Sequence, residues 1–213
     1  MPRRTDQMSF DFPPDRAAAI AAFEEARDEA RGCRACALWE PATQTVFGEG
    51  PVPAPVMLIG EQPGDKEDVA GKPFVGPAGQ TLDKALTEAG IPRSRVYVTN
   101  AVKHFKYVPR GKIRLHQKPV TVEIKACRPW LERELDFVQP KVAVAMGATA
   151  TQALFGKPMP VIQNRGQLFD LGEAKGLITI HPSYLLRIEE QAAAQAEYER
   201  FVEDLRLLLP YLG

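Results

Sequence analysis

The sequence contains few cysteines, few histidines and no excess of charge of either sign. Three cysteines among 213 residues are too few for a disulfide framework, which leaves metal binding, catalysis or plain burial as their roles. The 27 basic and 27 acidic residues balance, so a surface for a polyanion would have to be a local patch. No run approaches the roughly 18 apolar residues of a membrane span, and the first residues have no leader-like apolar core. We therefore expect a cytoplasmic protein.

The length and composition predict one globular domain. Apolar residues make up 45% and charged residues 25% of the chain, as in ordinary soluble proteins. Residues 1–15 are expected to form a flexible N-terminal tail, and residues 16–31, rich in alanine and glutamate, a helix. The domain would then span residues 16–213, and we expect it to be a monomer.

Four short apolar runs rich in β-branched residues predict strands. They lie at residues 55–60, 96–100, 141–147 and 176–183. Continuous apolarity without alternation is typical of strands covered on both faces, as in a parallel sheet. Segments with helical periodicity lie between and after these runs, at residues 78–90, 121–138 and 189–212. The alternation predicts an α/β protein: a single-domain three-layer α/β/α sandwich with a central parallel four-stranded sheet.

Polar residues follow the predicted strands at their carboxyl ends. They are Glu61 and Gln62 after the first strand, Asn100 after the second, Gly147 and Thr149 after the third, and His181 and Ser183 after the fourth. Ligands of such sheets bind beyond the carboxyl ends of the strands, so we expect these residues to meet in one site.

The loop at residues 60–83 is rich in glycine and proline and leads into a predicted helix. A phosphate-binding P-loop is excluded, because the Gly-Lys-Ser/Thr ending is absent and four acidic residues would repel a triphosphate. The loop is better suited to acid–base chemistry, although its acids would also fit a solvated face. Phe74 lies within it, either as a flat surface presented to a ligand or as a core anchor beneath the loop.

Residues 98–119 carry six lysines or arginines and no acid, and they include two of the three histidines. Such a segment favours a polyanion, and its cations would supply affinity without sequence specificity. The irregular span 101–119 is long for a connection, which usually marks a functional loop.

Cys33 and Cys36 form a Cys-x2-Cys pair, a spacing that lets two thiolates reach one metal. Alone, the pair is compatible with coincidence, a redox motif or half of a metal site. Cys127 begins a predicted helical turn much later in the chain, and His104 is the candidate for a fourth ligand. The alternative is that Cys127 is a buried small residue and that His104 faces a phosphate.

Four ordered motifs resemble those of the uracil-DNA glycosylase superfamily, specifically its iron–sulfur family 4. They are GEQPGDKEDVAGKPFVGPAG at 60–79, VYVTNAVK at 96–103, ACRPWL at 126–131 and HPSYLLR at 181–187. The resemblance extends from about residue 30 to residue 208. Within the family, GEQPG, the histidine of VKHF and the basic stretch ending in IRLH are similar to the UdgX branch, whose members bind uracil-containing DNA covalently.

The resemblance implies a cofactor and a base pocket. A [4Fe-4S] cluster would be held by Cys33, Cys36, His104 and Cys127. A uracil extruded from DNA would stack on Phe74, as base-acting enzymes must take their target out of the stack. Asn100 would read the pyrimidine edge, with Gln62 and Ser183 completing the substrate-binding set. His181 would donate a hydrogen bond to the uracil carbonyl oxygen, where negative charge develops.

The resemblance also implies a nucleophile. His116 would capture the sugar cation and form a bond to deoxyribose, while Glu61 and Asp68 orient it or accept its proton. The predicted DNA-binding residues are Lys112, Arg114, Lys118 and Arg187. The loop departs from the usual Lys-Arg-Arg-Ile-His, because Ile113 stands in place of a cation and Leu115 in place of isoleucine.

We therefore expect an enzyme that excises uracil from DNA, single-stranded DNA being preferred, and that stays linked to the deoxyribose through His116. One alternative is a hydrolytic family 4 glycosylase with turnover. Another is a non-catalytic iron–sulfur or zinc module that only binds nucleic acid, although it would not explain why Phe74, Asn100 and His181 gather at strand exits.

Overall fold

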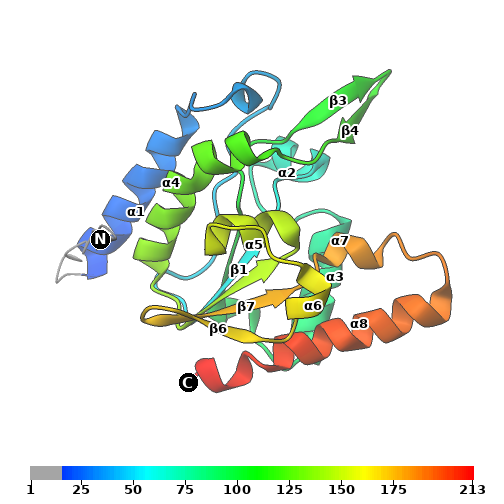
Figure 1. Cartoon of the computed structure of the whole chain (residues 1–213). Helices are drawn as coiled ribbons and strands as arrows, with labels where there is room; N and C mark the ends of the chain where they lie inside the picture. Colours follow the sequence, from blue (N-terminus) through cyan, green and yellow to red (C-terminus); the bar gives the residue numbers. More distant parts are fainter. Residues whose placement is uncertain (1–15) are drawn as a thin grey trace, which may run out of the picture.

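A five-stranded sheet forms the centre of the computed structural model, which describes residues 16–213 (Figure 1). The strand order is β2-β1-β5-β7-β6. The strands are β1 (Val56–Gly60), β2 (Val96–Asn100), β5 (Val142–Met146), β6 (Leu168–Leu171) and β7 (Ala174–Thr179). The four predicted strands correspond to β1, β2, β5 and β7, and they pair in parallel, as expected. The tail predicted at residues 1–15 lies outside the described residues.

The edge strand β6 was not predicted. It pairs antiparallel with β7 through a short hairpin, and its residues alternate between exposed and partly buried. A four-residue strand with one open edge has no continuous apolar run, so the pattern that reveals buried parallel strands does not reveal it. The three-layer α/β/α fold itself is confirmed, with one strand more than expected.

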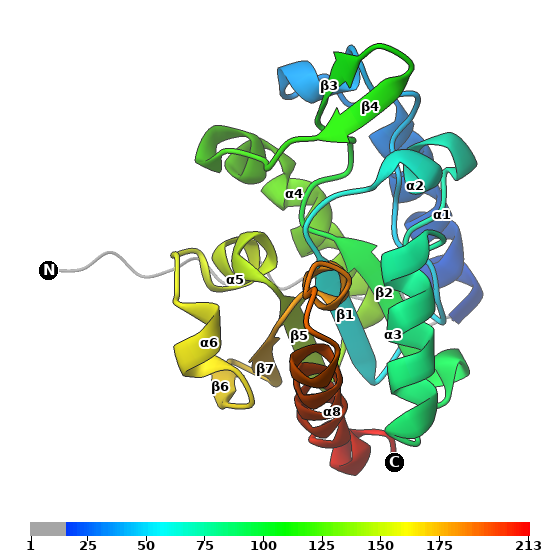
Figure 2. The ribbon, with the colours of Figure 1, turned by 90° about the vertical axis from the view of Figure 1, so that its right-hand side faces the viewer.

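Helices cover both faces of the sheet (Figures 1 and 2). They are α1 (Arg16–Arg31), α2 (Asp65–Ala70), α3 (Pro77–Glu88), α4 (Thr121–Val138), α5 (Ala148–Phe155), α6 (Val161–Asn164), α7 (Pro182–Leu185) and α8 (Gln191–Arg206). Three short 3-10 turns span Ala37–Trp39, Arg93–Arg95 and Leu209–Tyr211. No helix within residues 16–213 is long and apolar enough to cross a membrane.

Successive side chains of β1 point to opposite faces of the sheet, and so they contribute to two separate cores. Val56 and Leu58 pack on the side covered by α3, α7 and α8. Met57 and Ile59 pack on the opposite side, against α1, α4 and α5. All four side chains are fully buried, because successive residues of a strand point to opposite faces and both faces are covered.

The last helix is shorter than predicted. Residues 189–212 were expected to be helical, but α8 ends at Arg206 and a 3-10 turn follows at Leu209–Tyr211. Pro210 lies in that turn, and a proline has no backbone N–H to continue a helix.

The basic segment is a β-hairpin instead of an irregular loop. Its strands β3 (Tyr107–Arg110) and β4 (Ile113–His116) pair antiparallel and project from the body of the molecule (Figure 1). Gly111 turns the chain with φ +59, a value that glycine adopts without strain. The hairpin brings His116 back opposite Tyr107 at its base.

A tight turn before α3 fixes Phe74. Its φ of +56 is unusual for a residue with a side chain, and the turn is packed against Gly79 of α3. A Cβ at position 79 would lie 1.7 Å from the Phe74 carbonyl oxygen and 2.9 Å from its Cα. Only glycine fits at this position without a movement of the Phe74 backbone.

Replacing Gly79 by alanine is therefore expected to lower the free energy of unfolding by about 1–3 kcal/mol, the usual range for overpacking. Urea denaturation measures this change. Gly32→Ala is the matched control, because its Cβ would meet only the Glu29 carbonyl oxygen, at 3.4 Å. Equal stability of Gly79→Ala and the wild type would show that the Phe74 turn is not held as described.

Candidate active site

The strand exits converge on Gly60, the last residue of β1. A Cβ at position 60 would lie 2.4 Å from Asn100 Oδ1, 2.6 Å from Phe74 Cζ and 3.2 Å from His181 Nε2. Asn100 ends β2, Phe74 lies in the loop before α3, and His181 precedes α7. The structure thus brings three predicted base-pocket residues around one glycine, and they pack so closely against it that a side chain at position 60 would collide with them.

His181 is held as a neutral hydrogen-bond donor. Its Nδ1 accepts the backbone N–H of Ser183 at 3.2 Å and lies 2.8 Å from the Ser183 hydroxyl. A neutral ring that accepts at Nδ1 carries its proton on Nε2, the nitrogen nearest Gly60. Burial lowers the pKa of His181 to about 4, and the nearby charge of Glu61 opposes this shift only in part. The ring is therefore uncharged at neutral pH.

Glu61 joins the hairpin to the strand exits. Its Oε1 lies 3.2 Å from His116 Nε2, and its Oε2 accepts the Thr149 hydroxyl at 2.6 Å. Burial alone would raise the pKa of Glu61, but hydrogen bonds from His116 and Thr149 outweigh it and the pKa is lowered. The carboxylate therefore stays ionised beside a half-exposed imidazole. Thr149 was recognised as a residue at a strand exit but was not predicted to be a site residue. Its position at the strand exit was the signal that could have identified it.

Arg114 docks the hairpin onto α2. Its guanidinium forms ion pairs of 2.5 Å with both Asp65 and Asp68, and it lies over the rings of Phe105 and Tyr107. Two carboxylates therefore already pair with the guanidinium that was predicted to bind DNA phosphate, and its role in DNA binding stays a prediction.

Asp68 also differs from expectation. Its buried carboxylate accepts the Thr43 backbone N–H and the Arg114 guanidinium. It was expected to contact His116, but its bonded partners are Arg114 and the backbone of residue 43. Its negative charge therefore holds the hairpin at Arg114, two residues before His116, instead of acting directly on the imidazole.

Gln62 was expected to bind substrate, and the structure gives its side chain other partners. Its Nε2 donates to the carbonyl oxygens of Lys106 and Gln117, at 3.2 and 3.1 Å. Its Oε1 accepts the Lys106 backbone N–H at 3.1 Å. The amide thus joins both strands at the base of the hairpin, and substrate binding by Gln62 stays a prediction.

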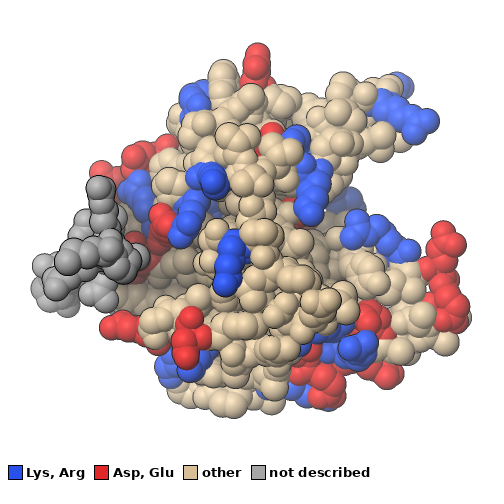
Figure 3. Space-filling model, in the orientation of Figure 1, with Lys and Arg blue, Asp and Glu red and all other residues tan. Residues whose placement is uncertain are grey.

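Three of the predicted DNA-binding cations remain available. Lys112, Lys118 and Arg187 are exposed, and none of them forms an ion pair with another residue of the described chain. Figure 3 shows basic side chains at the end of the projecting hairpin. Lys112 lies in the hairpin turn, Lys118 follows β4, and Arg187 follows α7 beside His181.

The three cysteines gather around the start of α4. The backbone N–H of Lys103 donates to Cys127 Sγ at 3.1 Å, and the Trp130 indole donates to Cys33 Sγ at 3.1 Å. The pKa of the Cys127 thiol is raised to about 12, mainly by burial and in smaller part by nearby Cys33 and Cys36, while Lys103 opposes the shift. Such a thiol needs a metal to lose its proton at neutral pH.

His104 is buried, and its Nε2 lies 3.0 Å from the Thr45 hydroxyl. Burial lowers its pKa, so the ring is neutral, as a ligand must be. Within residues 16–213, no group of three or more His, Cys, Asp or Glu side chains is close enough to hold a single metal ion. In donor type, and in the N–H groups directed at two of the sulfurs, Cys33, Cys36, His104 and Cys127 fit an iron–sulfur cluster.

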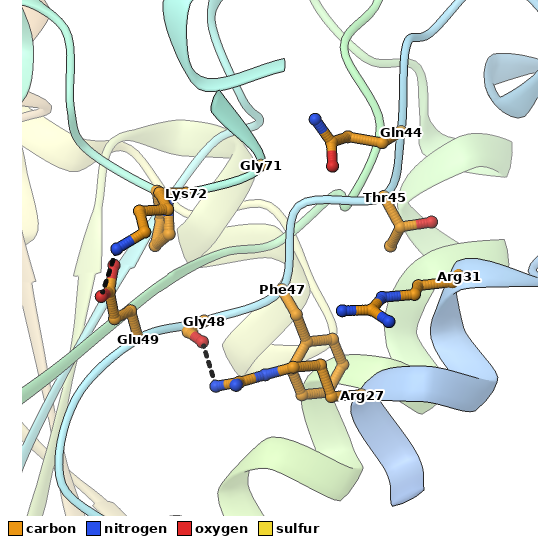
Figure 4. Close-up of a pocket in the computed structure, with 10 residues that line it drawn as sticks. Arg27, Arg31, Gln44, Thr45, Phe47, Gly48, Glu49, Gly71 and Lys72 are labelled. Carbon is orange, nitrogen blue, oxygen red and sulfur yellow. Dashed lines mark hydrogen bonds and ion pairs between the residues drawn. The ribbon is translucent and has the colours of Figure 1, made fainter. Parts of the chain in front are cut away.

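A separate cavity of about 250 Å³ lies between α1 and the loop after α2 (Figure 4). Arg27, Arg31 and Lys72 line it, but each is paired with an acid: Glu24 at 3.0 Å, Asp28 at 2.9 Å and Glu49 at 3.3 Å. None of its lining residues belongs to the predicted site. Each of the three cations that line the cavity therefore already has an acidic partner.

Comparisons with known proteins agree with this arrangement. The model of the uracil DNA glycosylase superfamily matches residues 47–206. The type-4 uracil-DNA glycosylase of Thermotoga maritima is 38% identical over 167 residues, which cover 78% of this chain and 83% of the relative. That of Pyrobaculum aerophilum is 32% identical over 184 residues, covering 80% and 86%. That of Sulfurisphaera tokodaii is 38% identical over 136 residues, covering 63% and 59%. The chain belongs to the uracil-DNA glycosylase superfamily.

Proposed function

We propose that the protein excises uracil from DNA and then becomes covalently linked to the deoxyribose through His116. The observation that carries the proposal is the 3.2 Å contact between His116 Nε2 and Glu61 Oε1. It sets an exposed imidazole beside an ionised carboxylate, and that carboxylate directly follows Gly60, around which Asn100, Phe74 and His181 gather. The excision step is supported by the names of the relatives, and the covalent step by the His116 geometry together with the UdgX-like motifs.

Uracil recognition would use the space above Gly60. An extruded base would stack on Phe74, whose turn is fixed by Gly79, and base–aromatic stacking is worth roughly 1–3 kcal/mol. The Asn100 amide has both a donor and an acceptor, and this pair matches the carbonyl and imide N–H of the pyrimidine edge. Stacking would hold the base, and the amide would distinguish uracil from bases whose edge presents a different pattern of hydrogen-bond donors and acceptors.

Departure of the base would use His181. When the bond between C1′ and uracil N1 breaks, its electron pair moves into the uracil ring and negative charge develops on the carbonyl oxygens. The Nε2–H of His181 donates to this charge from a fixed position, because Ser183 holds the opposite side of the ring. A donor fixed in advance stabilises the transition state without reorganisation.

Capture of the sugar would use His116. A lone pair of the neutral imidazole forms the new bond to C1′ of the oxocarbenium ion. The imidazole N–H proton then passes to Glu61, whose Oε1 already contacts Nε2. The product is an alkylated imidazole, which hydrolyses poorly and so prevents turnover.

Cys33, Cys36, His104 and Cys127 would hold the [4Fe-4S] cluster. When bound, the cluster supplies a redox-active centre and cross-links three segments that are distant in sequence. The chain's own residues direct hydrogen bonds to two of the sulfurs, from the Lys103 N–H and the Trp130 indole.

DNA binding would rely on Lys112, Lys118 and Arg187, which are exposed and have no ion-pair partners in the described chain. We propose that single-stranded DNA is preferred and that the protein acts as a monomer. A second candidate function is hydrolytic excision with turnover, which the relatives' name, type-4 uracil-DNA glycosylase, favours. In that reaction, water instead of His116 captures the sugar.

The first test is a denaturing gel of protein mixed with a single-stranded uracil-containing oligonucleotide. The wild type should form an adduct that resists SDS and heat, and a thymine-containing oligonucleotide should form none. His116→Ser should form no adduct and instead release uracil with turnover, because water reaches the vacated side of the sugar. Lys157→Ser, at an exposed lysine outside the proposed site, is the control and should keep the adduct. Turnover by the wild type without an adduct would support the hydrolytic candidate, and an adduct in His116→Ser would exclude His116 as the nucleophile.

The protonation of His181 is the second test. With a pKa of about 4, its ring should stay neutral and Nε2-protonated from pH 5 to 8. Because the unfolded ring titrates near 6.5, the unfolded state binds the proton more tightly. The contribution of His181 to stability should therefore rise with pH between about 4 and 6.5. Nitrogen-15 NMR of the three histidines, assigned with His→Gln variants, measures this directly. A His181 midpoint near 6.5 would contradict the donor role.

Iron content is the third test. Protein purified without oxygen should contain about four irons per chain with broad visible absorbance. Cys127→Ser should lose both the iron and much of the stability, because the buried sulfur is a ligand in the middle of a core helix. His104→Cys is the matched control and should keep the iron, since thiolate is the commoner ligand. Stoichiometric zinc without iron or sulfide would rule out the cluster.

A further inference from the structure

Lys103 is a buried lysine with an unusual set of partners. Its side chain is 1% exposed, and its Nζ lies 2.7 Å from Thr99 Oγ1, 2.6 Å from the Asn100 carbonyl oxygen and 2.5 Å from Glu134 Oε2. The ammonium thus has three acceptors, one for each of its protons. One of these acceptors is the backbone of the residue proposed to read uracil.

Glu134 on α4 completes the network. Its side chain is fully buried, and besides Lys103 it accepts hydrogen bonds from the Gly48 N–H and from the Tyr97 and Thr99 hydroxyls. A buried ion pair of this kind adds little net stability, because removing two charges from water offsets most of their attraction. Stability alone therefore does not account for a lysine at this position.

The backbone around Lys103 connects the two sites. The Ala101 and Val102 N–H groups donate to the carbonyl oxygens of Gly60 and Glu61, at 2.9 and 3.0 Å. The next N–H, that of Lys103, donates to Cys127 Sγ, and the Lys103 carbonyl accepts the Val46 N–H at 2.8 Å. A segment of five residues, 100–104, thus runs from the base pocket to the thiols with its backbone held at nearly every step.

We infer that Lys103, paired with Glu134, is a positioning residue for Asn100: its ammonium fixes the Asn100 carbonyl and so directs the amide side chain into the base pocket. The same residue holds the Cys127 sulfur through its backbone, so one lysine orders the path between the pocket and the thiols. The inference rests on the proposed reading of uracil by Asn100.

The test uses the double variant Lys103→Met with Glu134→Gln. Both charges disappear, while the glutamine oxygen still accepts from Gly48 and Tyr97 and its amide can donate to the Thr99 hydroxyl. The Asn100 carbonyl alone loses its partner. Thr99→Val is the matched control, because it removes a hydroxyl from the same network but keeps the bond between Lys103 and Asn100.

Hydrogen exchange of the protein alone gives the first readout. The amides of residues 101–104 should exchange at least tenfold faster in the double variant and at the wild-type rate in Thr99→Val, while iron content stays unchanged in both. If the double variant does not fold, Lys103→Leu with Glu134→Gln replaces it, because this pair also removes both charges and leaves no buried carboxylate without its counter-charge. Unchanged exchange in the folded variant would overturn the inference, whether or not the wild type excises uracil.

Kinetics give the second readout. Under single-turnover conditions at saturating uracil-containing DNA, the double variant should excise uracil at least tenfold more slowly, with DNA affinity within about twofold of the wild type. In an Asn100→Ala background, the same substitutions should cause no further loss, because Lys103 acts through Asn100. An additive loss would indicate a general structural role and overturn the inference. Absence of excision by the wild type would instead refute the proposed function and leave the exchange result decisive.

Discussion

The ion pairs between Arg114 and the two aspartates of α2 are the interaction on which the site depends. Asp68 is fully buried, so its charge would be costly without the guanidinium, and Arg114 in turn has no freedom to leave it. The hairpin is otherwise a two-stranded ribbon, which is marginally stable by itself. Docked by Arg114 at its middle and by Gln62 at its base, it presents His116 to Glu61. Without this docking, the histidine would be a mobile loop residue.

The other predicted site residues are also held by neighbouring groups. In each case the supporting group lies on the side of the residue that does not face the proposed ligand. Ser183 holds His181 at Nδ1, Thr149 holds Glu61, and Gly79 fixes the turn of Phe74. These supports are backbone groups, hydroxyls and a missing Cβ, and all lie on the rigid ends of strands and helices. These side chains are thereby held in fixed positions, which is the condition for electrostatic stabilisation of a transition state.

Much of the fold could be predicted from the sequence, because it depends on local periodicity. The four buried parallel strands have continuous apolar runs, and the helix predicted at 121–138 has those bounds in the structure. The gathering of strand-exit residues followed from the geometry of parallel sheets. The tasks of Arg114 and Gln62 could not be predicted, because their partners lie 46 and 55 residues away in sequence. In the sequence, a cation that pairs with a distant buried acid cannot be distinguished from one that binds a phosphate.

The docked hairpin is proposed to make His116 the nucleophile. Mass spectrometry of the digested adduct between wild-type protein and uracil-containing DNA identifies the modified residue. The deoxyribose remnant should lie on His116 itself, in a peptide that includes the end of β4. A remnant on Lys112 or Lys118, or intact unmodified peptides after uracil release, would contradict it.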